Sequence, residues 1–419
     1  MALVSFGACI STKAPRLAPV LARSGAPSGL CGPTARFPWR CRLPRTACRA
    51  GPSETRVSTP VDSSTDKPRA EEEPGVMVVV GGGIIGLSTM QELLKRGYRV
   101  ANVAKSTDPR STTSAVAAGF VFPYLLKPIS QCEEWVKVTL DHCREPPRPE
   151  LVSPMRAYAL HIEHKVEGEP DWGTCGLNYR RMEEAELEEF NKKRDWVEVV
   201  DGFEIDTYCF NTGAYLDWLV EDIRSMGGTF YPKTMSSLAG VFSDPEGFGG
   251  PILGIVNCTG VYARNVVGDE DVRPIYGQVV ALKPQEGVDT AYVVEDGAEI
   301  IGGSAYMFPR PDKIVCGGTA ILDKWSEEPD DDLTTGIIER VSRLAPELEI
   351  SRGMITEQRC GLRPSRPELR LEAEFDQELG VPVVHSYGHG GSGWTVFKGA
   401  SRDAADLVEQ VCPIKKSES

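Results

Sequence analysis

The sequence predicts an α/β fold around a parallel sheet, joined to a second domain of the α+β class. Two observations carry this prediction. A continuous β-branched run, Val76–Val80, is followed at once by a glycine-rich turn and a helical pattern, which is the order of a strand-turn-helix unit. A second strand, glycine loop and helix come only near the end of the chain, over residues 381–411. Because these units lie far apart in the sequence, we expect the second domain to be inserted between them.

The composition of the 419 residues is that of an ordinary globular protein, with 41% hydrophobic and 25% charged residues. The longest nearly apolar run, Val76–Leu87, is shorter than the roughly 18 residues that a membrane-spanning helix needs. A net charge of −14 argues against nucleic acid as the main partner. The five histidines do not occur with cysteine at metal-ligand spacing, so we also expect no metal site.

The N-terminal region differs sharply in charge from the rest of the chain. Residues 1–50 contain eight Lys or Arg and no Asp or Glu, as in a targeting peptide. Repeated prolines would interrupt the amphipathic helix of a mitochondrial leader, and a secretory signal needs a compact apolar core that is missing here. We therefore predict that residues 1–72 are a plastid (chloroplast) transit peptide and flexible linker. A mitochondrial leader is the second possibility. The remaining alternative is a disordered tail without a targeting function.

Periodic patterns predict the other elements in order. The helical spacing after the first turn covers 87–96 and ends at Gly97, a favourable helix C-terminus. The patterns then predict a strand over 99–103, solvated helices over 183–193 and 334–344, a helix over 215–226 and a strand over 252–256. The last unit is a strand over 381–385, a glycine loop over 388–393 and a helix over 394–411.

The first turn carries the motif Gly81-x-Gly83-x-x-Gly86 between a strand and a helix. In a dinucleotide-binding turn, these glycines permit the tight bend, the close approach of the pyrophosphate and the packing of helix on strand. The helix N-terminus adds free N–H groups and a partial positive charge. The motif therefore predicts a dinucleotide cofactor; the alternative is a tight structural turn.

The usual partner of the cofactor's ribose is missing. An acidic residue is expected roughly 20 positions after the glycines, but the second strand ends in Ala104-Lys105-Ser106, and Asp108 comes two positions late. Lys105 therefore leaves NADP open as an alternative cofactor, and the rest of the chain must decide.

Six blocks, the glycine turn among them, supply that decision. They are Gly81–Ser88, Thr112–Gly119 with Pro123-Tyr124, Asn257–Val261, Tyr306 with Pro309, Gly361–Pro367 and Tyr387–Gly393. In these blocks and their order the chain resembles the D-amino acid oxidase family, which includes the D-aspartate oxidases, from about Val76 to Val411. The resemblance implies a GR-type Rossmann domain that binds FAD, with an inserted substrate domain built on a mixed β-sheet. We assign 76–125, 205–270 and 355–412 to the FAD-binding domain, and 126–204 and 271–354 to the substrate-binding domain.

The resemblance also implies an activity. A family member oxidises a D-amino acid to an imino acid by hydride transfer from the substrate α-carbon to non-covalently bound FAD. The electrons then pass to dioxygen, which leaves as hydrogen peroxide, and water hydrolyses the imino acid to a 2-oxo acid and ammonia. The alternatives are a same-fold oxidase for D-aspartate, glycine or sarcosine, a flavin dehydrogenase with another acceptor, and a flavoprotein without catalysis. A homodimer is one option for the oligomeric state.

Three residues are the predicted catalytic group. A planar guanidinium can bind a carboxylate through two parallel hydrogen bonds, and the resemblance gives this task to Arg363. Tyr306 matches a tyrosine that also binds the carboxylate, and the carbonyl of Gly391 would accept a hydrogen bond from the substrate amine. The alternatives are a structural ion pair for Arg363 and a core position for Tyr306. We interpret His389 as structural, because hydride transfer in this family needs no side-chain base.

The resemblance also predicts the residues that contact FAD. The N-terminus of the last helix would stabilise negative charge on the flavin, and the hydroxyls could alternatively belong to an ordinary turn. The predicted cofactor-binding residues are Gly81, Gly82, Gly83, Ile85, Gly86, Thr112, Thr113, Ser114, Ala118, Gly119, Phe120, Met235 (through its backbone), Thr259, Gly390, Gly391, Gly393 and Thr395.

Two departures from the family concern the substrate. Many animal members carry a second active-site tyrosine in a mobile lid, four residues before the first, where this chain has Gly302. D-Aspartate oxidases place an arginine after Gly-Gly-Thr to receive the side-chain carboxylate, and here that position is Ala320. Arg310 is the alternative cation. We therefore expect neutral D-amino acids to be preferred.

Overall fold

The computed structural model describes residues 75–124, 126, 128–243 and 246–414. The predicted transit peptide and linker, 1–72, lie outside the described residues. The first described strand lies where the apolar run predicts it, and this strand, β1 (Val76–Val80), is buried along its whole length.

The first sheet has six strands among the described residues, in the order β14-β15-β7-β1-β2-β6. All neighbouring pairs in it are parallel except β14 with β15, which is antiparallel. The strands besides β1 are β2 (Arg99–Ala104), β6 (Thr229–Pro232), β7 (Ile252–Asn257), β14 (Arg370–Asp376) and β15 (Val381–Tyr387). Parallel strands end at one edge of the sheet, so the turns after β1, β7 and β15 lie near one another.

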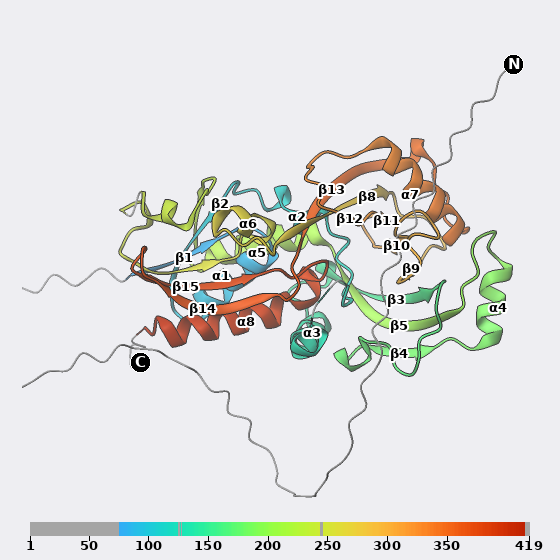
Figure 1. The fold of residues 1–419 in the computed structure, drawn as a ribbon, viewed down its shortest axis with the longest axis horizontal. Coiled ribbons are helices and arrows are strands. Elements are labelled where there is room, and N and C mark those ends of the chain that lie inside the picture. Colours follow the sequence, from blue (N-terminus) through green and yellow to red (C-terminus); the bar gives the residue numbers. More distant parts are fainter. Residues whose placement is uncertain (1–74, 125, 127, 244–245, 415–419) are drawn as a thin grey trace, which may run out of the picture. The chain divides into compact units, whose positions relative to one another are not determined.

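Three long helices pack together beside this sheet. α1 (Ile84–Lys95) contacts both α5 (Thr212–Ser225) and α8 (Gly393–Val411). The last helix runs along β14 and β15 (Figure 1) and also packs on α3 (Ile129–Arg144). Its apolar stripe explains this position, because Trp394, Phe397 and Ala404 are all buried. The short helices are α2 (Thr113–Val116) and α6 (Ala263–Val266).

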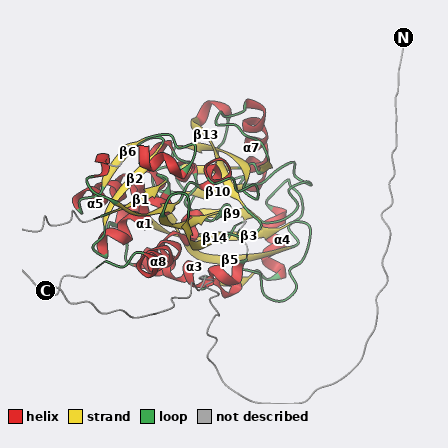
Figure 2. Ribbon diagram, turned by 60° about the vertical axis from the view of Figure 1, so that its left-hand side comes forward, coloured by secondary structure: helices red, strands yellow, loops and turns green. Residues whose placement is uncertain are grey.

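The second sheet contains nine described strands and is mixed. Its order is β12-β8-β11-β10-β9-β3-β5-β4, and β13 pairs with β8. β3 and β9 are parallel, and the other pairs are antiparallel. α7 (Asp331–Leu344) packs on β8, β10 and β11; Figure 2 shows it above β10 and β9 in that view. The remaining elements are β3 (Val152–His161), β4 (Asn178–Arg181), α4 (Glu184–Lys192), β5 (Asp201–Phe210), β8 (Arg273–Leu282), β9 (Thr290–Val294), β10 (Tyr306–Pro309), β11 (Ile314–Gly317), β12 (Ile321–Leu322) and β13 (Ile355–Ser365).

The fold class predicted from the sequence is confirmed, with a Rossmann-type sheet and a second, mixed sheet. The predicted domain boundaries stay a prediction, but two strands differ from them. β13 and the larger part of β5 (205–210) lie in segments assigned to the cofactor domain, yet both are strands of the mixed sheet. β13 belongs to the mixed sheet because it pairs with β8 from Ile355 to Ser365. This pairing carries Arg363 from the mixed sheet toward the glycine loop after β15.

The described helices include none that is both long and apolar enough to cross a membrane. Among the same residues, no group of three or more His, Cys, Asp or Glu side chains is placed to hold a metal ion.

Candidate active site

The glycine turn after β1 presents free amide groups. Gly81 has a φ of +122°, and a Cβ there would collide with the carbonyl oxygen of Cys258, so only glycine fits. Within the described chain, the amides of Gly82, Gly83 and Ile85 have no hydrogen-bond acceptor, and the first turn of α1 contains no acidic residue. Free donors at a helix N-terminus favour an anion such as a diphosphate.

Of the three consecutive hydroxyl residues 112–114, one contacts the glycine turn after β1, and the other two bond to backbone groups elsewhere. Ser114 Oγ accepts a hydrogen bond of 2.9 Å from the amide of Ile84. Thr112 donates to the carbonyl of Pro109 at 2.7 Å, within its own turn. Thr113 exchanges hydrogen bonds with the backbone of Leu362 on β13. Ser114 is therefore the hydroxyl that the structure places against the glycine turn.

A buried polar chain orients Thr259 beside the same turn. The Thr259 hydroxyl donates to Asn257 Oδ1 at 2.7 Å, and the Asn257 amide lies 3.1 Å from His385 Nδ1. His385 Nε2 in turn lies 3.0 Å from a carboxylate oxygen of Glu374. Burial, helped by the nearby Arg370, lowers the pKa of His385, so the neutral ring can link the amide to the carboxylate.

The segment after α2 is fixed against β5. Gly119 has a φ of +85°, and its carbonyl accepts a 2.9 Å hydrogen bond from the amide of Phe210. The carbonyl of Ala118 accepts from Arg310 at 3.2 Å. Phe120 then stacks on Phe308, with ring centroids 4.4 Å apart. The predicted flavin-lining segment therefore meets the strand that carries Tyr306.

The glycine loop before α8 joins two sides of the site. The amide of Gly390 donates to the carbonyl of Pro364 at 3.0 Å, immediately after Arg363. Gly391 is exposed on one side, whereas a Cβ there would collide with the ring of Tyr124. Gly393 is the first residue of α8, whose first turn has no acidic residue. The loop thus brings Gly390 and Gly391 next to Arg363.

The start of α8 is tied to the segment that contains Tyr124. Ser392 Oγ accepts from the amide of Tyr124 and donates to its carbonyl, both at 2.7 Å. Thr395 makes the same pair of bonds with Phe122, at 3.0 and 2.8 Å. The Thr395 hydroxyl is buried and committed to this backbone, so its part in a cofactor site is to hold the helix start in place.

Arg363 is half-buried and offers donors to a ligand. Its Nη1 donates to the carbonyl of Thr319 at 2.8 Å, and among the described residues no ion pair joins it to a carboxylate. Burial raises the pKa of Tyr306, an effect that nearby Arg363 opposes. The Tyr306 ring stacks on Phe308 at 5.1 Å. A guanidinium with free N–H groups beside a phenol hydroxyl is suited to bind one carboxylate.

His389 is buried, and one of its ring nitrogens has no polar partner among the described residues. Its Nε2 is buried and makes no hydrogen bond with the described residues, and its ring lies 6.4 Å from that of Trp135. Burial lowers the pKa of His389 to about 4, so the ring is neutral at neutral pH. A structural role for His389 stays a prediction, and its burial is consistent with that role.

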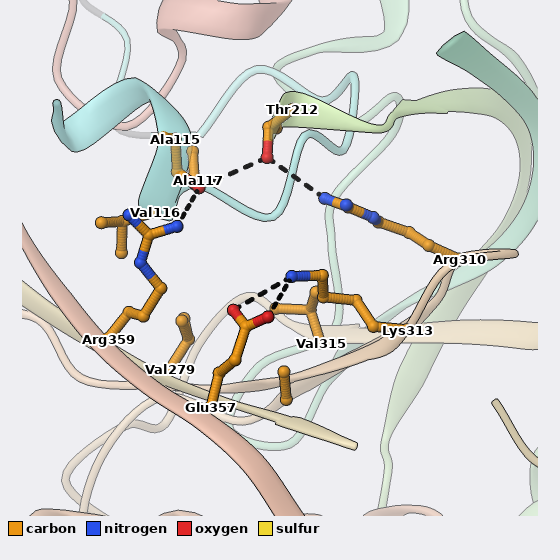
Figure 3. A pocket seen from close by; sticks show the side chains of 11 residues that line it. Ala115, Val116, Ala117, Thr212, Val279, Arg310, Lys313, Val315, Glu357 and Arg359 are labelled. Atoms are coloured by element: carbon orange, nitrogen blue, oxygen red, sulfur yellow. Dashed lines mark hydrogen bonds and ion pairs between the residues drawn. The ribbon is translucent and has the colours of Figure 1, made fainter. Parts of the chain in front are cut away.

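The Arg310 side chain is buried, and its donors are used within the protein. It is buried, pairs with Asp312 at 2.7 Å and also donates to Thr212 Oγ1 at 3.3 Å. Figure 3 shows it reaching toward Thr212, in a cavity of about 20 Å³ that Lys313 and Glu357 close with an ion pair. Such a cavity has room for about one water molecule. Arg310 therefore cannot replace the missing arginine at Ala320 as a receptor for a side-chain carboxylate.

Met235 follows β6, which pairs with β2, and its side chain packs against a hydrophobic cluster that includes Val80 of β1 and Val103 of β2. The contact of its backbone with FAD stays a prediction. Sequence reasoning also missed two contacts of the site, the ring of Phe308 and the carbonyl of Thr319. An aromatic residue two positions after Tyr306 is a weak signal for the first, and no sequence pattern marks the second.

The fold and the glycine turn are those of a dinucleotide-binding protein, and Arg363 lies next to the glycine loop before α8. The sequence pattern of the FAD dependent oxidoreductase family (DAO) matches residues 77–407. The chain therefore belongs to this family.

Individual relatives agree with the family assignment. A D-amino-acid oxidase from Rubrobacter xylanophilus is 35% identical over 332 residues, which cover 79% of this chain and 95% of that protein. A D-amino-acid oxidase from Streptomyces coelicolor is 33% identical over 81% of this chain and 98% of its own. The structure of glycine oxidase from Geobacillus kaustophilus superposes with a TM-score of 0.63 at 18% identity, covering 83% of this chain and 96% of that one. The last comparison shows a shared fold.

FAD is the cofactor of this family, and the residues present fit it. The free amides of Gly82, Gly83 and Ile85 are suited to its diphosphate. Lys105, which left NADP open, forms an exposed ion pair with Glu327 at 3.5 Å.

Proposed function

We propose that this protein is a D-amino acid oxidase that prefers neutral side chains. The observation that carries the proposal is the half-buried Arg363, which has no carboxylate partner among the described residues and lies beside Tyr306 and the glycine loop. One D-amino acid and one dioxygen give an imino acid and hydrogen peroxide. Water then converts the imino acid to a 2-oxo acid and ammonia.

Each residue of the site has a task in this reaction. Arg363 binds the substrate carboxylate through its guanidinium, and the Tyr306 hydroxyl adds a further hydrogen bond. The carbonyl of Gly391 accepts from the substrate amine. Bound FAD supplies the hydride acceptor and the route to dioxygen. The protein's contribution is therefore to orient the α-carbon and to exclude other binding modes.

The surroundings favour a neutral side chain. Phe120, Phe308 and Tyr306 form a continuous aromatic row next to Arg363. Arg310 is already paired with Asp312, and Ala320 supplies no charge at the position where D-aspartate oxidases have arginine. A carboxylate on the substrate side chain would lose its hydration there without a matching cation.

The test is peroxide release from the purified FAD-loaded protein, offered D-amino acids, their L-enantiomers, glycine and sarcosine. We expect stoichiometric peroxide with D-alanine and other neutral D-amino acids, and much less with D-aspartate. Turnover with an artificial electron acceptor but no peroxide would instead indicate a dehydrogenase. A preference for D-aspartate, glycine or sarcosine would contradict the proposed substrate class.

We also propose that the N-terminal region directs the protein to the plastid. The support is the acid-free, arginine-rich composition of residues 1–50 and its repeated prolines. A fluorescent protein fused after residue 72 should enter plastids, and entry into mitochondria would contradict the proposal. The homodimer stays a prediction that light scattering can check.

A further inference from the structure

Arg340 on α7 makes three hydrogen bonds to backbone carbonyls. Its Nε donates to Ser304 at 3.0 Å, Nη1 to Gly302 at 2.9 Å and Nη2 to Gly318 at 3.0 Å. The side chain is half-buried, and burial lowers the pKa of Arg340. A planar guanidinium can serve three acceptors in fixed directions, whereas a single ammonium nitrogen cannot reach all of them.

The three acceptors lie on two segments that are far from α7 in the sequence. Gly302 and Ser304 belong to the short loop between β9 and β10, which ends at Tyr306. Gly318 directly follows β11. The two segments also touch each other, because the amide of Gly318 donates to the Ser304 carbonyl at 3.0 Å. Arg340 therefore joins a loop and a turn that already share one bond.

The turn contacts both residues that would bind the substrate carboxylate, and the loop leads directly into one of them, Tyr306. The Tyr306 ring lies against the backbone of Gly317 and Gly318, where an added Cβ would collide with it. The next residue, Thr319, accepts the 2.8 Å hydrogen bond from Arg363. A shift of the loop relative to the turn would thus change the separation between the Tyr306 hydroxyl and the Arg363 guanidinium.

A cavity beside this junction gives the loop room to move. Its volume is about 270 Å³, and Arg340 forms part of its wall together with Gly302, Gly303, Thr319 and Gly336. Close packing around the loop would hold it even without Arg340, but an open cavity does not. On this side, the three hydrogen bonds of the guanidinium therefore add to the single Gly318–Ser304 bond in restraining the loop.

We propose that Arg340 is a positioning residue for the substrate carboxylate. By joining the 302–304 loop to the 318–319 turn, it holds Tyr306 and Arg363 at the separation that one carboxylate needs. The inference rests on the proposed function, since it assigns the carboxylate to Arg363 and Tyr306. It adds a residue that has no contact with the substrate.

The variants for the test are Arg340→Met, which removes all three donors, and Arg340→Lys, which keeps the charge. The matched control is Arg343→Met, three residues later on α7, at an exposed arginine. Gly303→Ala is a second variant, because Gly303 has a φ of +139° and a Cβ there would come within 2.9 Å of Arg340 Cζ, so the loop and the guanidinium must shift relative to each other. Three quantities are measured: the KM and kcat for D-alanine, the Kd of pyruvate from the flavin absorption change, and the Kd of FAD.

We expect Arg340→Met to raise the KM of D-alanine and the Kd of pyruvate by about tenfold or more, with a smaller change in kcat. Gly303→Ala should act in the same direction, Arg340→Lys should recover only part of the loss, and Arg343→Met should match the parent protein. FAD affinity should be unchanged in all four. Equal losses in FAD and pyruvate affinity would show a merely structural role and overturn the proposal. So would an unchanged pyruvate Kd.

The same measurements separate this inference from the proposed function. If the parent protein releases no peroxide with any D-amino acid, the proposed function fails, while pyruvate binding still reports on the Arg363–Tyr306 pair. A pyruvate Kd that Arg340→Met leaves unchanged would then refute the inference independently.

Discussion

The hydroxyl oxygen of Ser114 accepts a 2.9 Å hydrogen bond from the amide of Ile84, the first residue of α1. The carbonyl of Ser114 accepts a second bond, also 2.9 Å, from the indole of Trp394 in the first turn of α8. One residue therefore connects the glycine turn, the hydroxyl run and the C-terminal helix. These three segments form the predicted cofactor site, although Ser114 and Trp394 alone are 280 residues apart in the chain.

This connection predicts the effect of Ser114→Ala. Loss of the hydroxyl removes an acceptor at the N-terminus of α1 and loosens the turn that faces the diphosphate. One neutral hydrogen bond contributes about 1 kcal/mol, so the Kd of FAD should rise by about fivefold. Fluorescence titration of the FAD-free protein measures it. Ser111→Ala is the matched control, because Ser111 is exposed and bonds only within its own turn; an equal loss there would contradict the assignment.

Arg363→Lys tests the carboxylate-binding role. Lysine keeps the positive charge but loses the two parallel donors of the guanidinium. We expect kcat/KM for D-alanine to fall by about 100-fold, mostly through KM, since the charge-assisted pair with the substrate is weakened. Steady-state peroxide release gives both constants. A loss confined to FAD binding would instead place Arg363 in the cofactor site.

The local parts of this fold could be predicted from the sequence. The glycine motif, the strand before it and the helix that ends at Gly97 depend on residues close together in the chain, and α8 appears over 393–411 because its apolar stripe has helical spacing. The catalytic pair was inferred from resemblance. The structure adds the proximity of Arg363 and Tyr306, which no spacing could give.

The long-range features could not be predicted. Whether Arg310 is free or paired depends on Asp312 and on Thr212, about 100 residues away. β13 belongs to the mixed sheet because it pairs with β8. A strand pattern in the sequence does not show which other strand it will pair with. The three acceptors of Arg340 are carbonyls, which every residue has, so the sequence contains no signal for them.

Ala320→Arg tests the source of the substrate preference. The side chain of residue 320 is exposed at the cavity that Thr319 also lines, and the family resemblance marks this position as the site of the arginine in D-aspartate oxidases. A cation there would compensate the lost hydration of a side-chain carboxylate. We expect the ratio of kcat/KM for D-aspartate over D-alanine to rise by about tenfold or more. Ala320→Gln, which is long but neutral, should leave the ratio unchanged; an equal rise there would rule out charge as the cause.

His389 predicts a specific sensitivity of the fold to acid. The folded protein keeps its ring neutral, because burial lowers the pKa of His389 from 6.5 to about 4. As the pH falls below 6.5, the unfolded chain binds a proton that the folded protein does not. The free energy of unfolding should therefore decrease by up to about 1.4 kcal/mol per pH unit between 6.5 and 4, with no further contribution below 4.

Urea unfolding at several pH values, followed by tryptophan fluorescence, measures this slope. His389→Asn should make it shallower, and His164→Asn, at an exposed position, should leave it as in the parent protein. Some slope should persist, because burial lowers the pKa of His142 to about 3 in the same direction. A slope that His389→Asn does not change would mean that the ring at this position is not held neutral by its burial.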